Sequence, residues 1–143
     1  MPVYLVIKII HFLGLAAGVG TSFALITLAT ASASLEPTER LSFRLRAMAV
    51  TKNGSIGFLI LVLSGLGMLF MRGPASVMAA GGPAFHAKLT LVVIQAGMLG
   101  YSQVLRKRAR GGDARAMATL PKVGAAMLLL GVGIVIAAVL AFQ

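Results

Sequence analysis

Residues 123–143 read VGAAMLLLGVGIVIAAVLAFQ and carry no charged side chain. Crossing the hydrocarbon core of a bilayer takes about 20 helical residues, so this stretch is long enough to span it. Three more uncharged stretches precede it, at residues 9–35, 53–71 and 89–105. None of them shows the strict alternation of a membrane β-barrel strand. We therefore predict an all-α integral membrane protein, a single domain over residues 1–143 with four transmembrane helices at about 3–32, 53–72, 84–107 and 119–142.

The composition excludes the other broad classes of protein. Apolar residues make up 59% of the 143 residues and charged residues only 11%, whereas an ordinary soluble domain has about 25% charged residues. A disordered chain is excluded as well, because disorder requires low hydrophobicity. The chain has no cysteine, which rules out disulfides, thiolate metal sites and cysteine nucleophiles.

The basic residues are distributed asymmetrically between the connections. The formal net charge is +10, and most of it lies in two of the three connections. Under the positive-inside rule both of these are cytoplasmic, which places both termini outside, in a bacterial inner membrane. This topological role accounts for the charge, so no nucleic-acid partner is expected. The basic residues of the first connection are Arg40, Arg44, Arg46 and Lys52; those of the third are Arg106, Lys107, Arg108, Arg110, Arg115 and Lys122; the second has only Arg72.

Two local patterns refine this picture. Pro37 and Thr38 open a short charged segment whose apolar residues recur at helical spacing, which predicts a helix at the cytoplasmic headgroups. Asn53-Gly54 indicates a break before the second span, with a continuous bent helix as the alternative. In the first span, the small-xxx-small spacing of Gly14 and Gly18 favours the close approach of another helix.

Few ionisable groups lie within the spans. They are Lys8 and His11 in the first and His86 and Lys88 in the third, and no acidic residue accompanies them. Intramembrane ionisable residues are costly and indicate a functional site. Without carboxylates the chain has no acid-based proton relay, carboxylate metal cluster or paired-acid catalysis, and an anionic ligand is the natural partner of the lysines. With both termini outside, all four groups lie in the outer half of the bundle.

Helical geometry predicts which of these groups face one another. Lys8 and His11 are three residues apart and share a face of the helix. Gly14 lies on the same face and has no side chain, so the helix surface beside His11 is predicted to be flat enough to admit a planar macrocycle.

On the third span, a polar stripe recurs every seven residues at Lys88, Gln95 and Ser102 and is predicted to face the bundle. His86 lies about 200° around the helix from Lys88, at about 100° per residue, so the two side chains point in different directions.

Two interpretations of the histidines follow from the residues alone. In the first, His11 and His86 are ligands of a haem iron, and Lys8 and Lys88, or Arg72 at the membrane edge, bind the two propionates. In the second, His11 hydrogen-bonds a backbone carbonyl, His86 lies in the interfacial layer, and both lysines extend outward to water.

Residues 4–11 (YLVIKIIH) and 85–91 (FHAKLTL) resemble the HemJ family of membrane protoporphyrinogen IX oxidases. The resemblance implies four transmembrane helices, oxidation of protoporphyrinogen IX to protoporphyrin IX, and a b-type haem that passes electrons to a quinone. The family's essential histidine and lysine match His11 and Lys88, which are therefore the candidate catalytic residues. In this pattern Lys88, in place of His86, is the second axial ligand of His11-bound haem.

The chain departs from the family in the first span. Gly18 stands where the family has a tryptophan, Ile26-Thr27 where it has Pro-Arg, and Ser32 where it has a further histidine. These departures favour a divergent relative that keeps the haem site over an active oxidase. Other four-helix membrane families, CopD-like copper-resistance proteins among them, also begin with a lysine and a histidine in the first helix.

Two further functions are compatible with the sequence. One is a non-catalytic membrane subunit or assembly factor whose glycine-rich helices pack within a homo-oligomer or a larger membrane complex. The other is a small carrier for a metal or an anion.

Overall fold

Every regular element of the described chain is helical. The computed structural model describes residues 2–141, and four of its helical segments are long and apolar enough to cross a membrane. The predicted all-α fold is thereby confirmed, with four helical segments that match the length and composition of membrane spans. The helices are α1 (Pro2–Ala31), α2 (Pro37–Ala47), α3 (Thr51–Arg72), α4 (Pro74–Arg110) and α5 (Ala114–Ala141), with 3-10 turns at Ser32–Ser34 and Met48–Val50.

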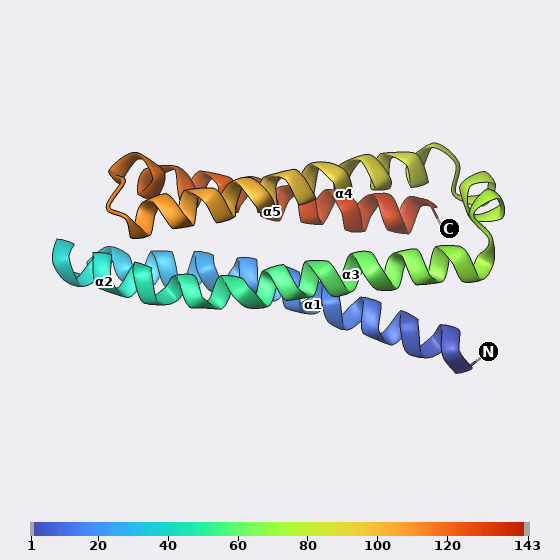
Figure 1. The fold of residues 1–143 in the computed structure, drawn as a ribbon, viewed down its shortest axis with the longest axis horizontal. Coiled ribbons are helices and arrows are strands. Elements are labelled where there is room, and N and C mark those ends of the chain that lie inside the picture. The colour runs from blue at the N-terminus through green and yellow to red at the C-terminus, as the bar shows by residue number, and fades with distance from the viewer. Residues whose placement is uncertain (1, 142–143) are drawn as a thin grey trace.

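The helices form two layers. Helix α1 packs along α3, and α4 packs along α5, while contact between the two pairs is much sparser. Figure 1 shows the pairs stacked as two layers, with the start of α1 and the end of α5 at the same end of the bundle. The other end holds the α1–α2 connection and the α4–α5 connection, where most of the basic residues lie.

The outer surface of the bundle suits a lipid environment. Large apolar side chains are widely exposed, among them Leu129 (73%), Val93 (71%) and Phe70 (70%). A soluble monomer rarely exposes so extensive an apolar surface. Contact with the acyl chains of a bilayer explains this exposure.

Glycines hold the α1–α3 pair together. A Cβ atom placed on Gly57 would lie 2.8 Å from the carbonyl oxygen of Gly14 and 2.8 Å from the amide nitrogen of Gly18. A Cβ atom on Gly14 would lie 2.9 Å from the Gly57 carbonyl oxygen. The predicted close approach at the small-xxx-small spacing is confirmed, and the helix that approaches is α3.

The segment expected to be a loop before residue 84 is largely helical. Gly73, with φ 84°, ends α3, and Pro74 begins α4 at once, because proline is preorganised for a first helical turn. Gly82 interrupts α4 with φ 50° and ψ −146°, and the helix resumes at Pro83. Helix α4 therefore consists of a short first piece before Gly82 and a long second piece from Pro83 to Arg110.

Two other boundaries also differ from expectation. Asp113 Oδ1 accepts hydrogen bonds from the backbone N–H groups of Arg115 and Ala116, at 2.9 and 3.1 Å. This N-cap starts α5 at Ala114, five residues before the predicted start at 119. The predicted break at Asn53-Gly54 is absent, because both residues lie inside α3.

Candidate functional site

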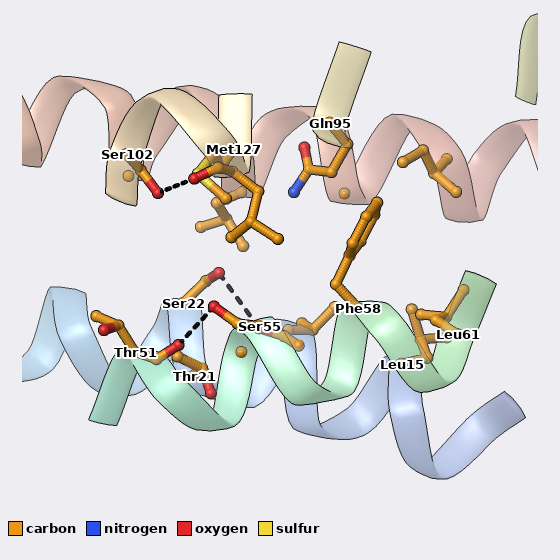
Figure 2. A pocket seen from close by; sticks show the side chains of 18 of the residues that line it. Leu15, Thr21, Ser22, Thr51, Ser55, Phe58, Leu61, Gln95, Ser102 and Met127 are labelled. Atoms are coloured by element: carbon orange, nitrogen blue, oxygen red, sulfur yellow. Dashed lines mark hydrogen bonds between the residues drawn. The ribbon is translucent and has the colours of Figure 1, made fainter. Parts of the chain in front are cut away.

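A large cavity lies between the two layers. Its volume is about 1110 Å³, and its wall is predominantly apolar. Pockets for organic ligands typically measure about 300–1,000 Å³. Figure 2 shows Phe58 of α3 and Gln95 of α4 pointing into this space from opposite layers. Its size and lining suit a mainly apolar organic ligand.

The structure brings three of the predicted site residues to this one cavity. Lys8 and His11 of α1 line it together with Lys88 of α4. These residues come from opposite layers, so the cavity has a histidine and a lysine on one wall and a second lysine on the other. Lys88 is close enough to act electrostatically on the His11 imidazole.

His11 is fixed by α3. Its Nδ1 lies 2.9 Å from Ser64 Oγ, and Ser64 Oγ lies 2.6 Å from the Ile60 carbonyl oxygen. Since a serine hydroxyl has one proton, Ser64 donates to that carbonyl and accepts from His11 Nδ1–H. The lone pair of the imidazole is then on Nε2, the atom that a metal would bind.

The imidazole also depends on a glycine. A Cβ atom on Gly65 would lie 3.3 Å from His11 Cε1, closer than side chains normally approach. Two neighbouring residues of α3 therefore position the ring. Ser64 forms a hydrogen bond with it, and Gly65 has no side chain that would clash with it. Sequence reasoning missed both, because a serine and a glycine in an apolar span give no signal of which helix they meet.

Cations surround the same part of the cavity. Arg72, at the end of α3, lines the cavity and lies 4.7 Å from the centroid of the Tyr4 ring, a cation–π contact. Lys8 and Lys88 line the cavity as well, and three further cations, Arg40, Arg44 and Arg106, belong to its wall. The chain has only three acidic residues, Glu36, Glu39 and Asp113, and all lie outside the four predicted spans. The chemistry of this wall suits the carboxylates of a bound ligand.

A polar stripe of α4 runs along the opposite wall. Lys88, Gln95 and Ser102 all line the cavity, which confirms the predicted orientation of this seven-residue repeat. Gln95 Oε1 is buried and has no hydrogen-bond partner among residues 2–141. Such an orphaned polar atom is costly in an apolar interior, and a polar group of a ligand in the cavity would satisfy it.

His86 and Gly14 have different environments from these residues. His86 is exposed, is not part of the cavity wall, and lies with Nδ1 2.9 Å from the Gly82 carbonyl oxygen. Gly14 is buried against α3, so the surface expected to admit a macrocycle is occupied by a helix. Gly18 does line the cavity, and a Cβ atom there would meet no described atom within 4 Å.

No cluster of protein ligands for a bare metal ion is present in the described chain. Over residues 2–141, no group of three or more histidine, aspartate or glutamate side chains is placed to hold one. An iron ion held in a macrocycle does not require such a cluster, because it needs only one or two ligands from the protein. No family model, curated protein or solved structure matches this chain.

Proposed function

We propose that this chain is a HemJ-like membrane protein that binds haem or a related porphyrin between its two helix layers. The observation that carries the proposal is His11, which lies on the cavity wall with Nδ1 2.9 Å from Ser64 Oγ, while Ser64 Oγ lies 2.6 Å from the Ile60 carbonyl oxygen. With Ser64 donating to that carbonyl, the imidazole keeps its lone pair on Nε2. Ligating histidines commonly donate their other ring N–H to a fixed acceptor, as His11 does here. The HemJ resemblance assigns the same histidine to haem.

The wall of the cavity fits a tetrapyrrole in three respects. His11 would hold the iron, the apolar side chains would contact the macrocycle, and Lys8 and Arg72 would bind its propionates. Bound b-type haem would supply one-electron redox chemistry. The exposure of His86 makes Lys88 the better candidate for the second ligand, in agreement with the family pattern.

The proposed topology places this site near the outer surface of a bacterial inner membrane. The end of the bundle that holds Pro2 and Ala141 has few basic residues, and the opposite end is rich in them. Under the positive-inside rule both ends of the chain are then outside.

An absorption spectrum tests haem binding. The protein purified from haem-replete cells should show a Soret band and split visible bands after reduction. His11→Ala should abolish the low-spin spectrum, whereas His86→Ala, a matched loss of an exposed imidazole, should leave it unchanged. A normal spectrum in His11→Ala would refute the proposal, and a colourless wild-type protein would favour the non-catalytic subunit.

Complementation of a strain lacking protoporphyrinogen oxidase separates binding from catalysis. We expect weak or absent rescue, because Thr27 stands where the family has an arginine, and small misplacements of a reacting ring cost about 100-fold in rate. Robust rescue that is lost in His11→Ala and Lys88→Ala would instead show that the chain is an active oxidase.

A further inference from the structure

A second pocket lies at the basic end of the bundle, between α3 and α4. Its volume is about 560 Å³. Four of the eight residues that line it are cations, one from α3 and three from α4, and none is acidic. The lining residues are Thr51, Lys52, Ser55, Ile56, Gln103, Arg106, Lys107 and Arg110.

Hydrogen bonds fix the two sides of this pocket relative to each other. Gln103 Nε2 donates to Ser55 Oγ at 2.9 Å, a direct link between α4 and α3. The half-buried guanidinium of Arg106 donates to Ser102 Oγ at 3.1 Å. The first bond joins α3 to α4 beside the pocket, where the two layers otherwise touch little, and the second orients Arg106 on α4.

The charges in the pocket repel one another. Arg110 acts electrostatically on Arg106, and no acidic residue lines the pocket to offset this repulsion. A bound anion would relieve the repulsion and would also join α3 to α4. Phosphate is well matched to arginine, which can form paired hydrogen bonds with its oxygens.

The surroundings of the pocket suit an acyl chain. Ile56 lines the pocket, and Leu59 and Leu63 follow it on the same face of α3 at helical spacing. All three side chains are more than half exposed. The chain runs from Thr51 at the basic end towards Arg72, so this apolar stripe leads from the pocket towards the middle of the membrane.

We propose that the pocket binds the phosphate of an anionic glycerophospholipid, with an acyl chain along the apolar stripe of α3. Basic pockets between transmembrane helices on the cytoplasmic side are a known type of lipid-headgroup site. The lipid would join the two layers at their basic end. The pocket shares Thr51, Ser55 and Arg106 with the wall of the large cavity. His11 does not line the pocket, and the proposal does not depend on haem binding.

Native mass spectrometry and thermal unfolding of the delipidated protein in a neutral detergent test the proposal. Phosphatidylglycerol should bind and raise the Tm, and phosphatidylcholine should do neither at the same concentration. Arg106→Gln/Arg110→Gln should weaken phosphatidylglycerol binding on the order of tenfold or more, because each basic contact contributes substantially. Arg108→Gln/Arg115→Gln is the matched control, since it removes the same charge at the same end without touching the pocket.

Three outcomes would overturn the proposal. Equal loss in both double variants would mean that general surface charge attracts the lipid, and equal binding of phosphatidylcholine would mean that the pocket does not recognise an anion. A Tm rise with soluble glycerol phosphate equal to that with the lipid would mean that the ligand is a free phosphate ester. If Arg106→Gln/Arg110→Gln does not fold, Lys52→Gln/Lys107→Gln changes two exposed cations of the same pocket and should show the same loss.

Discussion

At the scale of single residues, the candidate site depends on a hydrogen bond between helices. His11 of α1 and Ser64 of α3 are 53 positions apart, and Ser64 is 7% exposed. Because Ser64 gives its proton to the Ile60 carbonyl, it selects the His11 tautomer that has its lone pair on Nε2. In the proposed haem site, binding of the iron by His11 would therefore depend on Ser64 as well as on the histidine.

Replacing Ser64 with alanine should weaken haem binding without abolishing it. Loss of a group that orients a metal-ligating histidine typically costs about 10- to 100-fold in affinity. Haem titration of the apoprotein measures the change, and Ser76→Ala is the control, because Ser76 is exposed and donates to the backbone carbonyls of Arg72 and Gly73. Unchanged affinity in Ser64→Ala, with loss in His11→Ala, would show that Ser64 does not orient the ring.

At the scale of elements, α1 and α3 form the most closely packed pair through backbone-to-backbone contact. Lipid is as apolar as leucine, so no hydrophobic force drives helices together within the membrane, and close packing of small residues replaces it. The contact of Gly14 with Gly57 also positions Ser64 and Gly65, which follow on α3, next to His11. The packing of this pair is therefore a precondition of the site.

Gly57→Ala should destabilise the fold. The new methyl group would lie 2.8 Å from backbone atoms of α1 that cannot move independently, and overpacking of this kind costs about 1–3 kcal/mol. Unfolding in mixed detergent micelles measures the change. Gly20→Ala on α1 is the control, since its Cβ meets no described atom within 4 Å. Equal stability of the two variants would contradict the assigned α1–α3 contact.

At the scale of the whole molecule, the two ends of the bundle differ in charge. The cavity with His11 extends between the layers, and its Lys8 and Arg72 lie near the end where the chain starts and finishes. The lipid pocket lies at the opposite end, among the basic connections. The orientation of the bundle therefore decides from which side of the membrane each site is reached.

Reporter fusions test this orientation. Alkaline phosphatase fused after Gln143 should be active and a cytoplasm-dependent fluorescent reporter should be dark, because four and six basic residues in the first and third connections are expected to be retained inside. Fusion within the third connection should give the reverse pattern. A cytoplasmic C-terminus would place His11 in the inner half of the membrane.

The sequence alone determined the number of spans, the helical class and the charge difference between the two ends. These properties depend only on short stretches of the chain. The hydropathy of about 20 consecutive residues and the number of basic residues in a connection are both known without any tertiary contact. The polar stripe of Lys88, Gln95 and Ser102 could also be predicted, because helical geometry assigns residues seven apart to one face. The helical conformation of residues 74–81 could not be predicted, since alanine and glycine are compatible with both loop and helix.

Only the tertiary structure decided which faces meet. It paired His11 with Ser64 and Gly14 with Gly57, brought Lys88 to the same cavity as Lys8, and left His86 exposed. The physical reason is that every spanning helix is apolar around most of its surface, so its sequence does not indicate which side faces lipid and which faces another helix. Which face packs against another helix depends on the steric fit between segments far apart in the chain, and no local sequence pattern indicates that fit.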